Sequence, residues 1–484
     1  MNKAKKIVVV GAGLGGLAAA IRLAKAGHCV EVWEKNGSAG GKLQELALGD
    51  YRWDTGPSLM TMPEVLRDLF AQAGSRLEDH LKLERLECTC RYFWPDGTVI
   101  DEDEAFWSQP EVRRFLAYAR GIYELSGEAY LHHPPADFWR VFTWKNLPML
   151  RHLPKVATFR TLAQKVEEFF PDPYRRQLFQ RFATYNGSSP FLTPATFNII
   201  PYVEAHFGGW YVKGGMVQVA RALENLALSL GVTFRFQTEA VSWQAEVLAA
   251  RDGRTERPDF LVCNGDAIQA GTTWLAEAVP AGRRKRLSRP EPSCSGYVLF
   301  LGVKRKYESL QHHNIFFSED YRKEFRDIFE HKRLPEDPTV YVAVTARSDP
   351  GHAPEGKDNY FVLVNAPAVE RGAWAPQAYA AYRDVVVRKL ERCGLENLSR
   401  NIEVEKMFTA DDFAARDLAW KGSLYGWASH SIRASLFRPP LRSRADHRVF
   451  FVGGTTHPGG GIPLVLLSGK MAAEQILRQT GTCI

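Results

Sequence analysis

The sequence predicts an α/β protein in which one structural unit is assembled from segments that lie far apart in the chain. Two observations lead to this prediction. Near the N-terminus, an apolar run, three spaced glycines, a helix-like stretch and a second apolar run follow one another within residues 6–35. Near the C-terminus, the apolar residues 449–452 lead into a second glycine cluster, and another helix-like stretch follows it.

The N-terminal segment has the order of a dinucleotide-binding unit. Residues 7–10 indicate a buried parallel strand, because the run is apolar without alternation. Gly11, Gly13 and Gly16 then fit the spacing G-x-G-x-x-G, whose glycines allow a tight turn, close approach of a pyrophosphate and close packing of helix on strand. Residues 14–26 have helical composition and end at Gly27, and residues 28–33 indicate the second strand.

An acidic residue completes this unit. Glu34 follows the second strand, where a carboxylate can bind the hydroxyls of an adenosine ribose and disfavours a 2′-phosphate. Because the motif occurs in its full structural context, we predict a site for an ADP-containing cofactor, either NAD or FAD. The residues assigned to this part of the site are Gly11, Ala12, Gly13, Leu14, Gly15, Gly16, Glu34 and Lys35.

A second glycine pair and a second turn follow the acid. Gly40 and Gly41 precede Lys42, whose cation could lie near the phosphates. The Asp-Thr-Gly-Pro stretch at residues 54–57 predicts another tight turn. A simple NAD dehydrogenase would continue with further βα units, so this stretch favours FAD.

These segments resemble the two-dinucleotide-fold flavoproteins of the amine oxidase and carotenoid desaturase superfamily. Further blocks, at residues 184–216, 231–241, 260–266, 313–321, 422–426 and 450–463, resemble the bacterial-type phytoene desaturases, so the resemblance covers nearly the whole chain. It implies that a G-G-[RK] element contacts the flavin diphosphate and that the backbone of Val241 binds the adenine. The flavin contacts implied by the resemblance are Gly40, Gly41, Lys42, Gly56, Pro57, Ser58, Val241, Gly453, Gly454, Gly461, Ile462, Pro463 and Leu464.

The C-terminal glycine cluster gains a role from this resemblance. Gly453 and Gly454 would let the chain pass close to the flavin phosphates, and residues 457–461 would bend it across the isoalloxazine. Ile462 would start a helix whose N-terminal amides point at the flavin, where the helix dipole favours the negative charge of the reduced ring.

We therefore expect an α/β fold with three parts. A discontinuous Rossmann-like FAD-binding domain comprises residues 1–75, 215–275 and 430–484. A mixed-sheet substrate-binding domain comprises residues 76–130 and 276–429. A helical, membrane-associating part comprises residues 131–214.

The family implies FAD-dependent removal of hydrogens from a lipophilic polyene. The substrate would be phytoene, a C30 precursor or a later carotenoid, including 3,4-desaturation of a hydroxycarotenoid, and oxygenation of a terminal methyl group is the alternative within the family. Because a hydrocarbon binds through apolar area, at about 25 cal/mol per Å² buried, we expect a long apolar tunnel. Two other classes remain open: a flavin-less prenyl-binding protein of the GDP-dissociation inhibitor type, and an amine oxidase.

A membrane surface is the expected partner besides the substrate. Residues 138–160 interleave aromatic residues with Lys and Arg and contain no Asp or Glu, which suits either an interfacial segment on anionic lipid or a basic helix pair packed on its own core. The lipophilic substrate favours peripheral association with the inner face of the membrane in the cytoplasm. Neither a signal peptide nor a membrane-spanning run is predicted.

Composition excludes other partners. The net charge of +7 is a mild excess for 484 residues, and no nucleic-acid-binding signature accompanies it. The seven scattered cysteines predict reduced thiols, and the His pairs at residues 132–133 and 312–313 lack the spacing of a metal site. Glu204, His206 and His457 are candidates for a proton acceptor, but no catalytic acid or base is assigned. Since no second nucleotide fold is visible, oxygen or a quinone is the expected electron acceptor.

Overall fold

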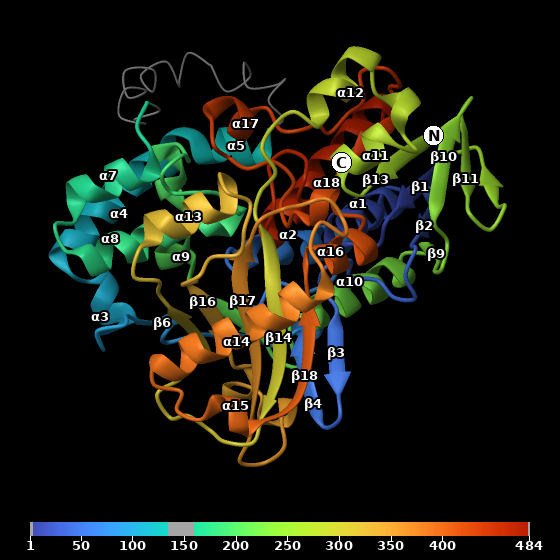
Figure 1. Cartoon of the computed structure of the whole chain (residues 1–484). Coiled ribbons are helices and arrows are strands. Elements are labelled where there is room, and N and C mark those ends of the chain that lie inside the picture. Colours follow the sequence, from blue (N-terminus) through green and yellow to red (C-terminus); the bar gives the residue numbers. More distant parts are fainter. Residues whose placement is uncertain (1–2, 134–158, 483–484) are drawn as a thin grey trace.

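The structure, a computed structural model, describes residues 3–133 and 159–482. Two larger sheets organise it: a parallel sheet in the upper right of Figure 1 and a mixed sheet in the lower centre. The predicted interfacial segment, residues 138–160, lies outside the described residues except for Phe159 and Arg160.

The parallel sheet collects strands from distant parts of the chain. Its strand order is β19-β13-β1-β2-β9, and every pair in it is parallel. The strands are β1 (Lys6–Val10), β2 (Cys29–Trp33), β9 (Thr233–Arg235), β13 (Phe260–Cys263) and β19 (Val449–Phe451). Ile7, Val8 and Val9 of the central strand are fully buried, as their uninterrupted apolar pattern predicts.

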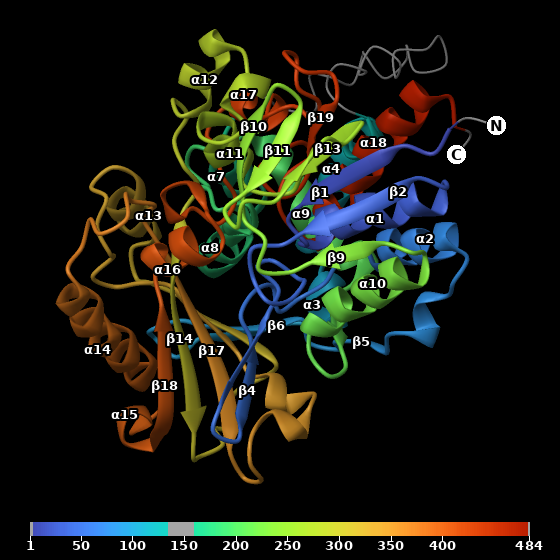
Figure 2. The ribbon, with the colours of Figure 1, turned by 90° about the vertical axis from the view of Figure 1, so that its right-hand side faces the viewer.

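Helices from both chain ends and from the middle of the chain cover this sheet (Figure 2). They are α1 (Leu14–Lys25), α2 (Pro63–Ala73), α10 (Val217–Ser229) and α18 (Ile462–Thr480). At Gly469 of α18, an added Cβ would stand 2.4 Å from the carbonyl oxygen of Gly15 and 2.9 Å from Cβ of Ala18. The first and last helices therefore approach each other so closely that only glycine fits at this position.

The mixed sheet has the strand order β18-β14-β17-β16-β15-β6-β7. Its strands are β6 (Cys90–Phe93), β7 (Val99–Glu102), β14 (Ser295–Val303), β15 (His313–Phe316), β16 (Val340–Ala343), β17 (Asp358–Ala366) and β18 (Ile402–Phe408). The β15–β6 pair is parallel and the other pairs are antiparallel. One face packs against α14 (Pro376–Arg392) through Tyr379, Tyr382 and Val386, so the opposite face is left to line a cavity.

A helical region packs beside β6 and β15, on the left in Figure 1. Its helices are α3 (Glu104–Trp107), α4 (Pro110–Ile122), α7 (Leu162–Phe169), α8 (Pro173–Gln180), α9 (Ile199–Phe207) and α13 (Tyr321–Phe329). Its core is aromatic: Phe170 and Phe179 stack with ring centroids 4.5 Å apart, and Phe115 lies against both. The short helix α5 (Glu128–His132) instead packs on the core of the parallel-sheet unit through Tyr130 and Leu131.

The remaining elements are short. They are β5 (Leu83–Arg85), β8 (Trp210–Val212), β10 (Ala240–Gln244), β11 (Val247–Ala250), β12 (Thr255–Glu256), α11 (Ala267–Thr272), α12 (Ala281–Leu287), α15 (Leu398–Asn401), α16 (Ala410–Arg416) and α17 (Ile432–Leu436).

A β-hairpin connects the two large sheets. It consists of β3 (Glu45–Leu48) and β4 (Tyr51–Asp54) and appears in Figure 2 beside β14 and β17. The Trp53 ring contacts Phe300 of β14 edge-on, with centroids 6.2 Å apart. The hairpin thereby packs its apolar side on the mixed sheet.

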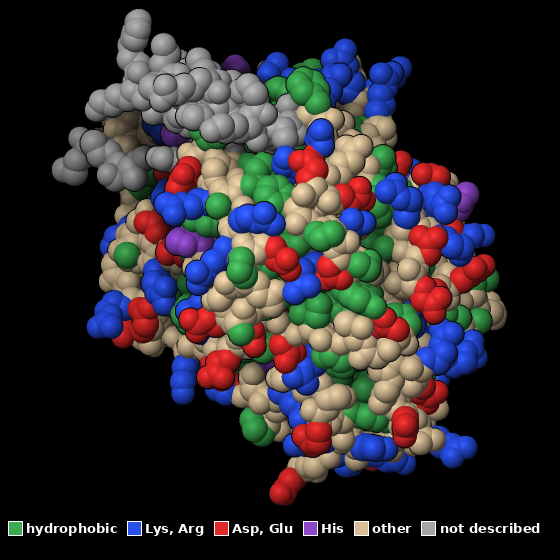
Figure 3. All heavy atoms as spheres, turned by 90° about the vertical axis from the view of Figure 1, so that its left-hand side faces the viewer, with side chains coloured by type: hydrophobic (Ala, Val, Ile, Leu, Met, Phe, Trp, Pro, Cys, Tyr) green, Lys and Arg blue, Asp and Glu red, His purple; other side chains and the backbone are tan. Residues whose placement is uncertain are grey.

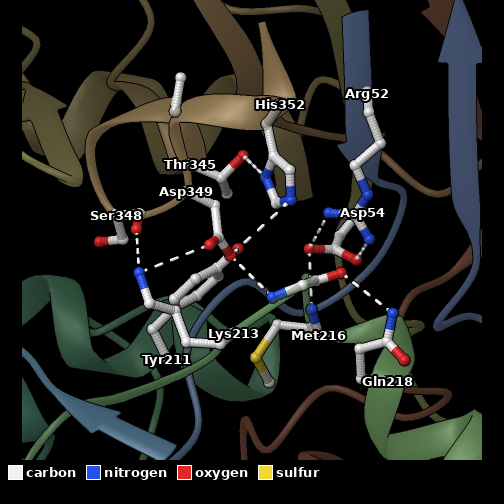
Figure 4. A network of polar contacts seen from close by, with 12 residues as sticks. Arg52, Asp54, Tyr211, Lys213, Met216, Gln218, Thr345, Ser348, Asp349 and His352 are labelled. Atoms are coloured by element: carbon white, nitrogen blue, oxygen red, sulfur yellow. Dashed lines mark hydrogen bonds and ion pairs between the residues drawn. The ribbon is translucent and has the colours of Figure 1, made fainter. Parts of the chain in front are cut away.

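The end of this hairpin also caps α10 (Figure 4). Asp54 is buried and accepts hydrogen bonds from the amides of Met216 (2.9 Å) and Val217 (3.0 Å), while Arg52 pairs with it at 2.8 Å. These amides would otherwise lack partners at the start of the helix. Asp54, which the sequence places in a tight turn, therefore fixes α10 of the parallel-sheet unit to the hairpin.

The surface carries charges of both signs. On the face drawn in Figure 3, Lys and Arg side chains alternate with Asp and Glu over the described residues. Within residues 3–133 and 159–482, no helix combines the length and hydropathy needed to cross a bilayer.

Candidate active site

A large cavity lies between the parallel sheet and the mixed sheet. Its volume is about 1010 Å³, and both sheets contribute to its lining. The end formed by the parallel-sheet unit is lined by glycine-rich backbone, and the end formed by the mixed sheet is lined mainly by apolar side chains. Of the predicted cofactor residues, all except Ala12, Gly16 and Val241 line this cavity.

The N-terminal glycines have distinct structural roles. Gly11 has a φ of +99°, which a side chain would disfavour. A Cβ on Gly16 would stand 2.3 Å from the carbonyl oxygen of Gly11, so Gly16 allows α1 to lie against β1 without lining the cavity itself. Gly13 precedes α1 without a side-chain cap, and the first turn contains no acidic residue. The first amides of α1 therefore face the cavity with a positive helix end that suits a phosphate.

Glu34 lies beside this turn with its carboxylate buried. Oε2 accepts from the amide of Ala12 and Oε1 from the amide of Asn36, both at 2.8 Å. Burial raises the pKa of Glu34, while these two amides oppose the shift. Each oxygen keeps further acceptor capacity, so the carboxylate can bind two hydroxyls at the cavity wall.

Asn264 was not predicted as a site residue, but it belongs to the glycine-rich end of the cavity, which we call the cradle. It follows β13, lines the cavity and donates from Nδ2 to the carbonyl of Gly11 at 3.3 Å. Its side chain occupies the space that a Cβ on Gly13, Gly15 or Gly453 would need, with separations of 2.5, 2.8 and 2.9 Å. The sequence signal for Asn264 was its position directly after a buried strand, within the block at residues 260–266.

The second glycine pair packs on the first. Gly40 donates to the carbonyl of Ala12 at 2.9 Å, and a Cβ on Gly41 would stand 3.2 Å from Cα of Gly13. Lys42 is half-buried, its Nζ donates to the carbonyl of Leu424 at 2.6 Å, and desolvation of the ammonium lowers its pKa. The backbone of residues 40–42 thus lies beside the N-terminus of α1, where a phosphate would bind. The Lys42 ammonium points instead to a loop of the C-terminal half.

The turn after the hairpin lines the middle of the cavity. Gly56, Pro57 and Ser58 all contribute to the lining. A Cβ on Gly56 would stand 2.4 Å from the carbonyl oxygen of Lys42, so this approach requires glycine. The Ser58 hydroxyl lies 2.5 Å from the hydroxyl of Tyr341 on the mixed sheet.

The C-terminal cluster brings a second helix end to the cavity. Gly453 has a φ of +102° and donates to Oγ of Ser468 at 2.8 Å. Gly461 precedes α18 with a φ of +104° and no side-chain cap, and the first turn of α18 contains no acidic residue. The lining residues of this cluster are Gly453, Gly454, Gly461, Ile462, Pro463 and Leu464. Two uncapped helix N-termini therefore open into one cavity.

Val241 lies outside this cavity. It is 36% exposed and lines a smaller neighbouring cavity, whereas Glu239 and Ala240 of the same region line the large one. The proposed adenine contact thus lies at the border between the large cavity and the smaller one.

The candidate proton acceptors do not line the cavity. Glu204 is buried and accepts from the hydroxyl of Tyr185, and the His206 ring stacks on Tyr202 at 5.2 Å. His457 is fully buried with Nε2 2.9 Å from the carbonyl of His133, and burial lowers its pKa to about 4. Among the described residues, no group of three His, Cys, Asp or Glu side chains could hold a metal ion.

The mixed sheet supplies a row of side chains to the other end of the cavity. Ile315, Tyr341, Leu363 and Val298 pair in register across four strands, and all four line the cavity. The apolar wall is completed by Phe197, Ile199, Ile200, Val203, Phe361, Phe413 and Leu436. This end suits an elongated apolar ligand.

A family comparison agrees with this geometry. The model of the family described as "Flavin containing amine oxidoreductase" matches residues 14–477. The chain belongs to this family. This flavin oxidoreductase matches the 4,4'-diapolycopene oxygenase of Methylomonas sp at 36% identity, covering 98% of this chain and 99% of the relative. It matches the 1-hydroxycarotenoid 3,4-desaturase of Flavobacterium sp. (strain P99-3) at 34% identity with the same coverage. These relatives place it in the carotenoid desaturase type of the family.

Solved structures share the fold of this flavin oxidoreductase. An oxidoreductase from Methanosarcina mazei aligns with a TM-score of 0.66 at 16% identity, over 97% of this chain and 100% of that chain. Cyclohexylamine oxidase from Brevibacterium oxydans aligns with a TM-score of 0.61 at 15% identity, over 99% and 100%. The predicted α/β fold with parallel and mixed sheets is thereby confirmed. The residues present also fit a flavin dinucleotide, because the uncapped helix ends, the glycine cradle and Glu34 face one cavity.

Proposed function

We propose that the protein is an FAD-dependent desaturase of a lipophilic carotenoid-type polyene. The observation that carries this proposal is the continuous cavity, which joins a glycine-rich dinucleotide cradle to an apolar wall formed by one face of the mixed sheet. The carotenoid enzymes that match the chain over nearly its whole length support the same substrate class.

FAD fits better than a smaller flavin. Glu34 offers acceptors for ribose hydroxyls. The N-termini of α1 and α18 present amides for phosphate groups and for reduced flavin. Gly41 and Gly453 let their backbone segments lie close to the cradle. FMN has no adenosine, so it would leave the Glu34 side of the cavity unused. In this proposal, residues 1–75, 215–275 and 430–484 form the FAD-binding domain, and Val241 contributes backbone at the adenine border.

The reaction removes two hydrogens from adjacent carbons and leaves a new carbon–carbon double bond. A bound FAD would supply the acceptor for one of them as hydride, and the other would leave as a proton. The residues of this chain orient the polyene along the row of Ile315, Leu363 and Val298 and exclude water from the reacting carbons. Each 100 Å² of apolar surface that they bury contributes about 2.5 kcal/mol to binding.

Expression in cells that accumulate a defined polyene tests this proposal. Separate hosts would contain phytoene, an acyclic C40 carotene, or a C30 precursor, and the extracted pigments would be compared with those from cells that express the Glu34→Ala chain. We expect a product with a longer chromophore in at least one host. An aldehyde product without additional double bonds would favour oxygenation of a terminal methyl group, and one relative is named an oxygenase. Unchanged pigments in every host, with FAD bound to the protein, would contradict the proposal.

We also propose that the protein docks on the inner face of an anionic membrane and passes its electrons to oxygen or a quinone. Phe159 is 98% exposed next to the basic segment at residues 138–158, Phe437 is 60% exposed, and α12 carries Arg283, Arg284, Lys285 and Arg286. Figure 1 draws α12 and α17 along the same side of the molecule. Sedimentation with anionic vesicles, but not with neutral vesicles, would support this docking, and a variant with α12 arginines replaced by glutamine should sediment less.

A further inference from the structure

Three hydrogen-bonded polar side chains interrupt the apolar wall of the cavity. The Tyr341 hydroxyl lies 2.7 Å from Nδ1 of His313 and 2.5 Å from Oγ of Ser58, and all three residues line the cavity. Tyr341 stands in the row between Ile315 and Leu363, which are apolar. A pure hydrocarbon polyene has no donor or acceptor that could form a hydrogen bond with these hydroxyl and imidazole groups.

His313 has one ring nitrogen left over. The side chain is 2% exposed, and Nε2 has no hydrogen-bond partner within residues 3–133 and 159–482. An unpaired buried polar atom costs about 1–3 kcal/mol unless a partner arrives. Burial lowers the pKa of His313 well below its ordinary value, so the ring is neutral.

The hydrogen bonds among these three side chains can run in either direction. If Tyr341 donates to Nδ1 of His313, then Nε2 carries the ring proton and donates to a ligand oxygen. If Nδ1 instead donates to Tyr341 and Tyr341 donates to Ser58, then Nε2 presents a lone pair. The neutral ring can therefore donate a hydrogen bond from Nε2 to a carbonyl oxygen, or accept one at Nε2 from a hydroxyl group.

A fixed cation lies on the same side of the sheet. Arg181 lines the cavity, and its Nε donates to the hydroxyl of Tyr92 at 2.9 Å. Tyr92 pairs with Ile315, whose side chain points to the same face as that of His313 because side chains alternate along a strand. Arg181 is also held by Glu102 at 3.1 Å, so its guanidinium cannot move away.

From this arrangement we propose that His313, Tyr341, Ser58 and Arg181 form an oxygen-binding subsite, and that the preferred polyene carries a hydroxyl or carbonyl group. The inference rests on the proposed function, because it assumes that a polyene enters this cavity. It adds the chemical class of the substrate: the apolar row binds the chain, and the subsite selects an oxygenated form of it.

Equilibrium binding of a matched set of ligands tests the subsite. The FAD-loaded protein in detergent would be titrated with an acyclic carotene, its 1-hydroxy derivative and the corresponding terminal aldehyde, and binding followed by the absorption of the polyene. We expect the wild type to bind one oxygenated ligand about tenfold more tightly than the carotene. His313→Phe should abolish this preference, and His313→Gln should restore part of it, since its amide reaches the position of Nε2.

His352→Gln is the matched control. His352 is also a buried histidine, but its Nδ1 lies 3.0 Å from the Thr345 hydroxyl, and it does not line the cavity. This variant should keep the preference for oxygen. Equal affinity of the wild type for all three ligands would overturn the subsite and leave the proposed function standing. Loss of FAD from His313→Phe alone would also overturn it, because the residue would then serve the cofactor. Failure of the wild type to bind any of the three polyenes would overturn the proposed function itself.

Discussion

The amide of Ala12 donates to Oε2 of Glu34 at 2.8 Å, so the glycine turn after the first strand is bonded directly to the acid after the second. The carboxylate therefore fixes the turn as well as facing the cavity. Its second oxygen is held by the amide of Asn36. A change at Glu34 should thus affect both the shape of the cradle and its acceptors.

Glu34→Gln should lower the affinity for FAD by at least about tenfold, because hydrogen bonds to charged groups contribute about 1.5–3 kcal/mol each. The amide end of glutamine would face a backbone N–H instead of accepting from it. Titration of the apoprotein with FAD, followed by flavin fluorescence, measures this effect. Glu31→Gln is the control, since Glu31 lies on β2, three residues before Glu34, and does not itself line the cavity. Its carboxylate accepts from the indole of Trp33 at 2.6 Å. Equal FAD affinity in both variants would contradict the role of Glu34.

Gly16→Ala should lower the free energy of unfolding by about 2 kcal/mol or more, as expected for overpacking against backbone. The added methyl would stand 2.3 Å from the carbonyl oxygen of Gly11 and push α1 away from β1. Denaturant unfolding of the apoprotein measures the loss. Gly37→Ala is the comparison, because no heavy atom lies within 4 Å of its added Cβ. A Gly16→Ala protein as stable as Gly37→Ala would show that the helix can shift without cost.

Asp54→Ala should destabilise the protein by about 3 kcal/mol, since it removes the cap of α10 and leaves the half-buried charge of Arg52 without this partner. Thermal unfolding would show the change, and Asp50→Ala, at the exposed tip of the same hairpin, should have little effect. Because Asp54 does not line the cavity, the folded variant should still bind FAD. Loss of FAD without loss of stability would place Asp54 in the cofactor site instead.

Glu324 makes stability depend on pH. Burial raises its pKa from 4.5 to about 7, although the hydroxyls of Ser318 and Thr339 both bond to it at 2.7 Å. The folded state therefore binds an extra proton between pH 4.5 and 7. Its contribution to stability is complete below pH 4.5 and is lost as the pH rises through 7, by about 3 kcal/mol in total.

Relative to wild type, Glu324→Gln should therefore gain stability between pH 5 and pH 8. Chemical unfolding at several pH values measures the difference in free energy. The exposed Glu319→Gln should show no such trend. A constant difference between Glu324→Gln and wild type across this range would contradict the raised pKa.

Much of the cradle could be predicted because its information is local. The spacing of Gly11, Gly13 and Gly16 between a buried strand and a helix specifies the turn, and α1 and β2 begin and end within one residue of the predicted bounds. The start of α18 at Ile462 is likewise where the glycine cluster predicts it.

The remainder depends on contacts between distant segments. Asn264 matters because β13, α1 and the C-terminal cluster converge on it, which no spacing reveals. Asp54 belongs to a predicted turn but caps a helix that begins at residue 217, far along the chain. His313 and Tyr341 meet only because β15 and β16 pair in one register.

The contact of Asn264 with Gly13 and Gly453 has a consequence for how the protein is made. The first half of the cradle is synthesised long before Gly453 and α18, because these lie more than 400 residues further along the chain. A nascent chain can therefore form β1, α1 and β2 without a complete site for the dinucleotide. A complete site for the dinucleotide must therefore await synthesis of α18, and a protein truncated before residue 449 would lack the edge strand β19 and one of the two helix ends that face the ligand.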